Sequence, residues 1–179
     1  MWLAAGSGGA LYYSGHLRVT LEELARTLGE VLLERRLRLA VAESCTGGWV
    51  AKCITDIAGS SHWFDRGFVT YSNLAKQDML GVSAATLDVA GAVSEATVTE
   101  MARGALQHSN ADIAAAISGI AGPGGEVPGK PVGTVCFAWA RRDGLLRVET
   151  RHFDGNRASV RRQSVLHALD GVLHAAGAG

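Results

Sequence analysis

The sequence predicts an α/β protein whose sheet is mixed and only partly parallel. Two apolar segments, residues 39–42 and 111–117, each run into a loop of hydroxyl residues and glycines, and helical patterns separate them. Strands that alternate with helices are typical of a parallel sheet. The dipeptide Asp143-Gly144 lies between two strand-like segments, which indicates a hairpin and therefore an antiparallel part.

The composition limits the class of protein. The 179 residues are 47% hydrophobic and 19% charged, which is typical of one globular domain. Seventeen basic residues balance seventeen acidic ones without a long basic run, so no nucleic-acid partner is expected. No apolar run could span a bilayer, so no membrane association is expected either. The three widely spaced cysteines fit neither a disulfide framework nor a zinc site and favour a reducing, cytoplasmic compartment.

The domain is expected to start after a short N-terminal segment. Residues 1–15 are rich in glycine, alanine and serine and lack the basic region and apolar core of a signal peptide. We interpret them as a mobile leader or an expression remnant, and residues 16–179 as a single domain. Thr20 and Glu23 form a capping box, and apolar residues at helical spacing follow to about Arg36.

Caps and hydrophobic periodicity predict the remaining elements. A helix is expected after residue 48 to about residue 58, followed by one from residue 73 to a stop at Gly81 and a short one over 83–90. A longer helix is expected from a cap at Ser94 to near His108, and an amphipathic helix over residues 157–173. Further strands are expected over 63–71, 132–140 and 145–153.

The turn after the first apolar strand is the first candidate site. Ser44 lies where α/β sheets bind ligands, beyond the carboxyl end of a strand. The N–H groups of Thr46, Gly47 and Gly48 begin a helix and can attract an anion or a developing oxyanion, and the glycines allow a substrate to approach. The alternative is an ordinary strand-to-helix connection capped by Ser44 or Thr46, and both interpretations stay open.

Tyr71 and Lys76 form a second candidate site, at the end of the strand over 63–71. If this end faces Ser44, the three side chains converge, and a lysine whose pKa is lowered by burial or by a neighbouring cation can deprotonate the serine. The alternative is a solvated Lys76 and a Tyr71 at the edge of the core, which the residues alone favour.

The second apolar strand also ends in a polar loop, at Ser118. Because both loops lie at the same edge of the sheet, a binding crevice is expected there. Arg157, Arg161 and Arg162 gather at the start of the last helix, where cations oppose the helix dipole. A bound phosphate would resolve this conflict, and ion pairs with local acids such as Asp154 are the alternative.

Six segments of the chain, in this order, resemble the CinA C-terminal domain family, the nicotinamide-nucleotide amidases. They are residues 42–48, 67–73 with Lys76, 91–95, 118–123, 130–134 and 153–157. The resemblance covers residues 21–173. The large molybdopterin-binding-like domain that precedes this one in full-length CinA proteins is absent, so the chain resembles the stand-alone form.

The resemblance implies a three-layer α/β/α sandwich and the hydrolysis of nicotinamide mononucleotide to nicotinate mononucleotide and ammonia, in bacterial pyridine nucleotide salvage. It implies no metal or organic cofactor. By position it makes Ser44 the nucleophile and Tyr71 and Lys76 its activating partners. The residues expected to contact the substrate are Thr46, Gly47, Gly48, Ser118, Arg157 and Arg161.

Two details qualify these positions. Ser118 stands where many members have threonine, so a hydroxyl is retained, and Arg157 matches an arginine expected at the substrate phosphate. Asn156 stands where many relatives have an acid, which leaves the orientation of Arg157 open.

The resemblance also implies a homodimer or another homo-oligomer. Trp49, Trp63 and Trp139 are candidate interface anchors.

Two other functions remain as alternatives. The first is a non-catalytic nucleotide-binding module of the CinA type, regulatory or interacting, which would use the same loops without an activated serine. The second is a different amidase or a phosphoester hydrolase. The six histidines are scattered and form no metal-ligand pattern with acids, which counts against metal-assisted phosphoester cleavage.

Overall fold

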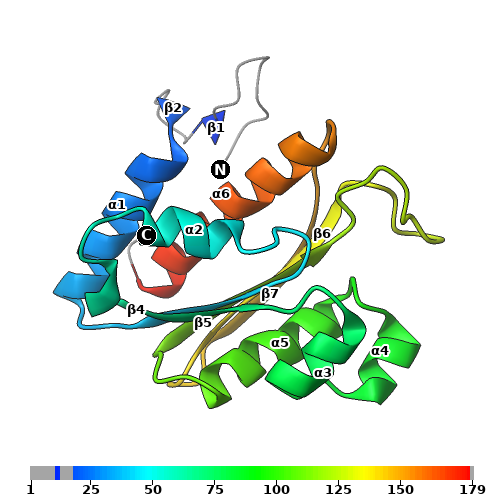
Figure 1. The fold of residues 1–179 in the computed structure, drawn as a ribbon, viewed down its shortest axis with the longest axis horizontal. Helices are drawn as coiled ribbons and strands as arrows, with labels where there is room; N and C mark the ends of the chain where they lie inside the picture. Colours follow the sequence, from blue (N-terminus) through cyan, green and yellow to red (C-terminus); the bar gives the residue numbers. More distant parts are fainter. Residues whose placement is uncertain (1–10, 13–17, 178–179) are drawn as a thin grey trace.

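The structure, a computed structural model, describes residues 11–12 and 18–177. Its main sheet has the strand order β4-β3-β5-β6-β7 (Figure 1). The strands are β3 (Leu39–Glu43), β4 (Phe64–Val69), β5 (Ile113–Gly119), β6 (Thr134–Arg141) and β7 (Leu146–His152). β3 pairs parallel with β4 and β5, whereas β5–β6 and β6–β7 pair antiparallel, so the predicted mixed sheet is confirmed.

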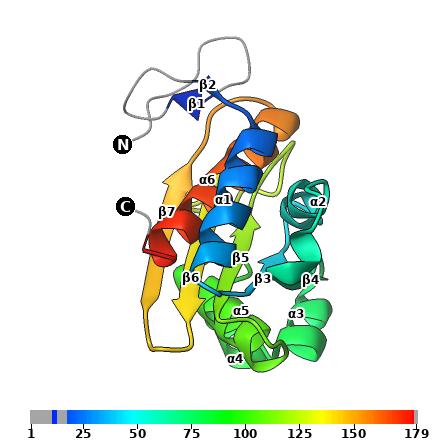
Figure 2. The same ribbon diagram turned by 90° about the vertical axis from the view of Figure 1, so that its left-hand side faces the viewer.

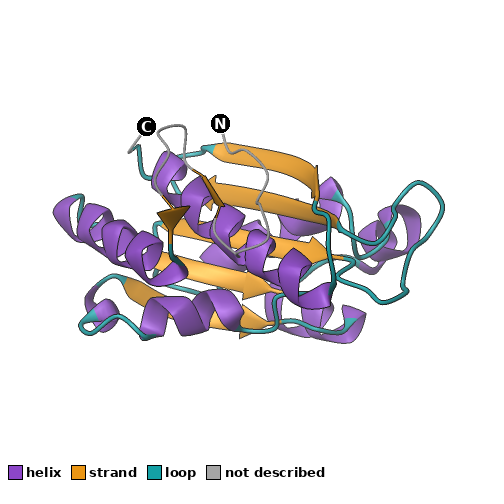
Figure 3. Ribbon diagram, turned by 90° about the horizontal axis from the view of Figure 1, so that it is seen from above, coloured by secondary structure: helices purple, strands orange, loops and turns teal. Residues whose placement is uncertain are grey.

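Helices cover both faces of the sheet, which makes three layers (Figure 2). One face carries α1 (Leu21–Glu34), α2 (Trp49–Thr55) and α6 (Arg157–Ala175), and the other carries α3 (Asn73–Leu80), α4 (Ala84–Ala90) and α5 (Glu95–Gln107). Figure 3 shows helices of one layer lying over the strands. The α/β fold expected from the sequence is confirmed. None of the described helices is both long and apolar enough to cross a membrane.

Local signals placed most helix starts correctly, and the errors lie at the ends. Thr20 and Glu23 form both hydrogen bonds of the capping box, Ser72 caps α3, and Gly81 ends it. The first helix stops at Glu34, earlier than expected, and α2 stops at Thr55. Helix ends are the least certain feature of a sequence pattern because the last turn depends on tertiary contacts.

Of the segment interpreted as a leader, the structure describes Leu11–Tyr12 (β1), which pairs antiparallel with Arg18–Val19 (β2). The rest of residues 1–15 lies outside the described residues.

Two of the three tryptophans expected at an interface belong to the core. Trp139 is fully buried between the sheet and α6, and its Nε1 donates to the carbonyl of Ala168 at 3.0 Å. Gly171 permits this packing, because a Cβ there would lie 2.1 Å from the Trp139 ring. Trp63 is 2% exposed and packs against Gly29 in the same way. The prediction that they anchor an interface is therefore wrong.

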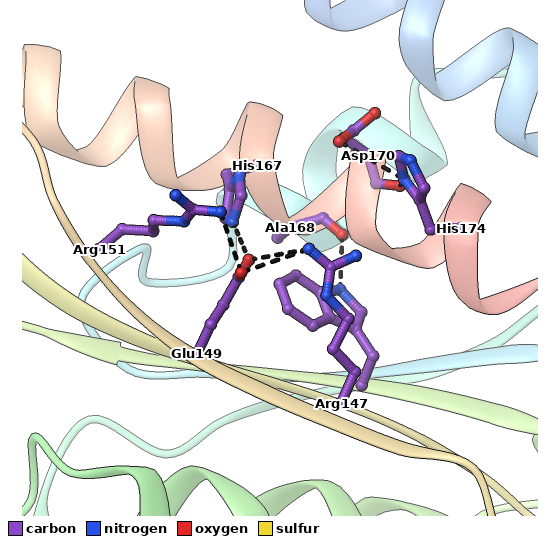
Figure 4. Close-up of polar contacts among 8 residues, drawn as sticks. Arg147, Glu149, Arg151, His167, Ala168, Asp170 and His174 are labelled. Carbon is purple, nitrogen blue, oxygen red and sulfur yellow. Dashed lines mark hydrogen bonds and ion pairs between the residues drawn. The ribbon is translucent and has the colours of Figure 1, made fainter. Parts of the chain in front are cut away.

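A polar cluster joins β7 to α6 (Figure 4). Glu149 is hydrogen-bonded to His167 and forms ion pairs with Arg147 at 3.3 Å and Arg151 at 3.0 Å. The hydrogen bond to His167 and the nearby positive charges lower the pKa of Glu149 to about 2. The cluster therefore stabilises the contact between the edge strand and the last helix most strongly when Glu149 is ionised.

We expect Glu149→Gln to lower the free energy of unfolding by about 1.5–3 kcal/mol near neutral pH. The folded pKa lies below the ordinary value of 4.5, so this stabilisation is complete above pH 4.5 and is lost as the pH falls towards 2. Urea unfolding of both proteins near pH 7 and near pH 2 tests this, with the exposed Glu30→Gln as control. An equal difference between variant and wild type at both pH values would contradict it.

Candidate active site

A pocket of about 360 Å³ opens where β3 and β5 end. Its lining comes from five parts of the chain: Ser44 and Cys45 after β3, Tyr71, Asn73 and Lys76 after β4, Ala92 and Val93 before α5, residues 118–125 from the end of β5 onwards, and Arg157 of α6. These are the loops that the sequence analysis placed at one edge of the sheet. The expected crevice is therefore present in the structure.

Ser44 and Lys76 meet inside this pocket. The Nζ of Lys76 lies 3.1 Å from the Oγ of Ser44 and 2.9 Å from the carbonyl oxygen of Thr70, to which it donates. Lys76 is only 1% exposed, so it is not the solvated surface lysine of the alternative interpretation. Ser72 caps α3 and thereby starts the helix that carries Lys76 towards the sheet.

Burial has opposite effects on the reactivity of Lys76 and of the neighbouring Cys45. Burial lowers the pKa of Lys76 from its ordinary 10.5, and among the described residues its Nζ contacts the Ser44 hydroxyl and the Thr70 carbonyl instead of a carboxylate. Burial also raises the pKa of the neighbouring Cys45 thiol to about 12, and the charge of Glu43 adds to this effect. Burial therefore shifts Lys76 towards the neutral amine and keeps Cys45 as a thiol.

Tyr71 lies at the mouth of the pocket and not between Ser44 and Lys76. Its side chain is exposed, and its hydroxyl accepts a hydrogen bond of 3.1 Å from Nη2 of Arg157. Arg157 also donates from Nη1 to the carbonyl of Gly122 at 2.8 Å. The structure thus brings Arg157 and Tyr71 together and leaves Ser44 in direct contact with Lys76. Asn156, the departure from the family pattern, caps α6 by accepting from the N–H of Ser159.

Arg161 points to the back of the turn and does not line the pocket. Its Nε donates to the carbonyl of Cys45 at 3.1 Å and its Nη2 to that of Thr46 at 2.8 Å. Its guanidinium lies 5.3 Å from the centre of the Trp49 ring. Its N–H groups donate to these carbonyls and not to Asp154, and Arg161 lies outside the pocket lining, so the predicted direct substrate contact does not fit its position.

The turn itself uses two of the three N–H groups that the sequence analysis offered to a ligand, those of Gly47 and Gly48. Gly47 and Gly48 adopt positive φ angles of 61° and 90°, which glycine tolerates. The N–H of Gly47 donates to the carbonyl of Ser44 at 3.1 Å, and that of Gly48 donates to Glu43 at 2.9 Å. Thr46 is fully buried and does not line the pocket. These three residues shape the turn, and their expected role as substrate contacts does not fit their positions.

Glu43 is the residue that the sequence analysis missed. It is fully buried and accepts from the N–H groups of Gly48, Val50 and Ala51 at 2.8–3.1 Å. The signal that could have found it is a glutamate at the end of a buried strand, five residues before Gly48, a helix N-cap that has no side chain.

Ser118 lies beside Ser44 on the neighbouring strand. Ala42 pairs with Ala116 and Glu43 with Ile117, which brings the two serines to the same level of the sheet. Ser118 is 1% exposed, and its Oγ donates to the carbonyl of Ala92 at 2.7 Å. Because the hydroxyl proton of Ser118 is already donated to Ala92, only the lone pairs of its oxygen are left for a ligand. Ser118 therefore favours a ligand N–H group.

No group of three or more His, Cys, Asp or Glu residues in the described ranges could hold a metal ion. The pocket offers instead a serine, a buried lysine, an arginine and main-chain groups. Such a set suits the attack of an activated hydroxyl on a carbonyl group.

Comparisons with known proteins identify a matching family and similar chains. The model of the CinA C-terminal domain matches residues 21–176. The nicotinamide-nucleotide amidohydrolase PncC of Escherichia coli (strain K12) is 57% identical over 151 residues, which cover 83% of this chain and 90% of the relative. The PncC of Enterobacter agglomerans is 52% identical over 153 residues, which cover 86% of this chain and 93% of that relative.

A solved structure shows the same fold. The competence/damage inducible protein CihA from Agrobacterium tumefaciens superimposes with a TM-score of 0.83 at 47% sequence identity, covering 86% of this chain and 94% of the other. The family model spans nearly all described residues. The sequence identities to the two PncC relatives, 52% and 57%, are well above the level at which two chains share only a fold. The chain therefore belongs to the CinA C-terminal domain family.

Proposed function

We propose that the chain is a nicotinamide-nucleotide amidohydrolase that converts nicotinamide mononucleotide to nicotinate mononucleotide and ammonia, in the pyridine nucleotide salvage of a bacterial cytoplasm. The names and high identity of the PncC relatives support the reaction. The observation that carries it is the 3.1 Å contact between the Ser44 hydroxyl and the buried amine of Lys76. A homodimer or other homo-oligomer stays a prediction.

The first half of the reaction forms an acyl-enzyme. Neutral Lys76 keeps its donor bond to the Thr70 carbonyl and accepts the Ser44 proton on its lone pair. The Ser44 oxygen bonds to the carboxamide carbon, whose carbonyl oxygen becomes an oxyanion. The C–N bond then breaks, and the nitrogen takes the proton from the Lys76 ammonium and leaves as ammonia.

The second half restores the serine. A water molecule gives a proton to Lys76 and bonds to the ester carbon, and the bond to the Ser44 oxygen breaks as that oxygen takes the proton back. The product is the carboxylic acid, which releases its proton to solvent and becomes the carboxylate. Lys76 therefore serves both halves as the single proton carrier, without Tyr71.

Ser118 orients the substrate in this scheme. Its hydroxyl proton is held by the Ala92 carbonyl, so its lone pairs accept an N–H of the carboxamide. The carboxylate of the product has no N–H to donate, so the same contact becomes repulsive and favours product release.

Arg157 provides the positive charge at the pocket mouth for the substrate phosphate. We expect Arg157→Ala to raise KM about 10- to 100-fold, because a charge-assisted contact is lost while the Ser44–Lys76 pair is untouched. Steady-state kinetics tests this. Arg162→Ala is the matched control, since Arg162 is on the same helix and does not line the pocket. A change in kcat with constant KM would contradict the phosphate role.

The experiment that tests the function is ammonia release from nicotinamide mononucleotide by the purified protein. Release supports the amidase. Nucleotide binding measured by calorimetry without release would instead support the non-catalytic binding module.

A further inference from the structure

We propose that the main-chain N–H of Cys45 is the oxyanion donor of this site, and that Glu43 and Arg161 are positioning residues that hold it in place. The inference rests on the amidase function proposed above. The sequence analysis offered the N–H groups of the helix start as candidate oxyanion donors. The inference assigns this role instead to a turn that two charged side chains hold from different sides.

The hydrogen bonds of the turn leave few N–H groups for a ligand. The N–H of Ser44 donates to the Ile117 carbonyl, that of Gly47 to the Ser44 carbonyl and that of Gly48 to Glu43. Within the described chain, the N–H groups of Cys45 and Thr46 donate to no other residue. Thr46 is fully buried and does not line the pocket, whereas Cys45 lines it beside Ser44. Among the N–H groups of this turn, that of Cys45 is therefore the one that lies at the pocket and is not bound to another described residue.

The direction of this N–H follows from the geometry of the peptide unit. In a planar trans peptide the C=O and the following N–H point in opposite directions. The Ser44 carbonyl points to the N–H of Gly47, so the N–H of Cys45 points away from the turn. The N–H of the residue after a nucleophile commonly stabilises the oxyanion that forms when the nucleophile attacks.

Glu43 holds the helix side of the turn. Its carboxylate binds the N–H groups of Gly48, Val50 and Ala51 at 2.9, 3.1 and 2.8 Å. Gly48, the N-cap of α2, has no side chain with which to cap the helix. The protein's own carboxylate therefore occupies this helix start, and neither an oxyanion nor a substrate phosphate can bind there.

Arg161 holds the turn from α6. It donates to the carbonyls of Cys45 and Thr46 and lies over the Trp49 ring. A planar guanidinium suits two adjacent carbonyls, which the single ammonium of a lysine does not reproduce. With three N–H groups bound by Glu43 and two carbonyls bound by Arg161, the peptide units around Cys45 have little freedom to rotate.

The experiment compares wild type with Glu43→Gln and Arg161→Lys. The readouts are kcat, the Kd of nicotinate mononucleotide, and the affinity for a nucleotide whose carboxamide is replaced by an aldehyde. Ser44 adds to the aldehyde carbon, its proton passes to Lys76, and the carbonyl oxygen becomes the oxyanion. This analogue therefore reports on the oxyanion donor, and the product nucleotide reports on the rest of the pocket.

We expect kcat and the affinity for the aldehyde to fall together, about 10- to 100-fold, with the Kd of nicotinate mononucleotide changed less than about threefold. Replacing Cys45 by its α-hydroxy acid, which puts an ester oxygen in place of the N–H, should lower kcat about 100-fold or more. Asp56→Asn, which removes an exposed carboxylate at the other end of α2, is the control for charge and should leave all three values unchanged.

Different results would contradict the roles of Glu43 and Arg161, the role of Cys45, and the proposed function. If the variants lose product affinity and kcat by the same factor, Glu43 and Arg161 have a general structural role and the inference is wrong. If the ester at Cys45 keeps wild-type kcat, another group stabilises the oxyanion. A wild type that releases no ammonia would contradict the proposed function, whereas an active wild type with unaffected variants would contradict this inference alone.

Discussion

Replacing Ser44 by alanine is expected to abolish ammonia release from nicotinamide mononucleotide, with a loss in kcat of about 10⁴-fold or more. The alanine removes the hydroxyl oxygen that contacts Lys76 and is, among the described residues, the one placed to bond to the substrate. The neighbouring Cys45 does not replace it, because burial raises the pKa of its thiol to about 12. The measurement is single-turnover ammonia release together with calorimetric nucleotide binding.

A matched control is available for this variant. Ser60 is as buried as Ser44 but lies in the turn before β4, away from the pocket. Ser60→Ala should keep wild-type turnover. If Ser44→Ala also kept its turnover, the covalent route would be wrong and a water molecule activated by Lys76 would have to attack directly.

Replacing Lys76 by methionine is expected to lower kcat about 10²- to 10⁴-fold, because the general base is lost while the apolar volume is kept. Only the neutral amine can accept the Ser44 proton. Burial lowers the pKa of Lys76, so the wild-type kcat/KM should rise with pH through that lowered pKa and then level off. The pH profile of kcat/KM for both proteins is the measurement, and a profile of unchanged shape in Lys76→Met would contradict this role.

The same variant should be more stable than wild type. In the unfolded chain Lys76 has a pKa near 10.5, whereas in the folded chain its pKa is lower, so the unfolded state binds more protons between these values. Wild-type stability should therefore rise with pH in that range, and Lys76→Met should lack this slope and have a higher Tm at neutral pH. Lys52→Met, at an exposed lysine of α2, should show neither effect. A lower Tm for Lys76→Met would show that the charged amine is well solvated.

The sequence by itself determined the class of fold and the neighbourhood of the site. Capping at Thr20 and Ser72 and the stop at Gly81 depend on residues a few positions apart, so local patterns are sufficient to predict them. The two apolar strands that end at Ser44 and Ser118 placed both loops at one edge of a parallel pair, as the register confirms. The resemblance to the CinA family followed from the same segments and is confirmed by the family match.

Only the tertiary structure decided which side chains enter the pocket. Arg157 and Arg161 are four residues apart at one helix start, yet Arg157 lines the pocket and Arg161 holds carbonyls more than 100 positions away in the chain. Whether Lys76 is buried against Ser44, and whether Glu43 takes up the start of α2, depends on how helices dock on the sheet. Trp63 and Trp139 were misjudged for the same reason, since a glycine on a facing helix determines whether a large ring is buried. Contacts between distant segments carry this information, and no periodicity within one segment contains it.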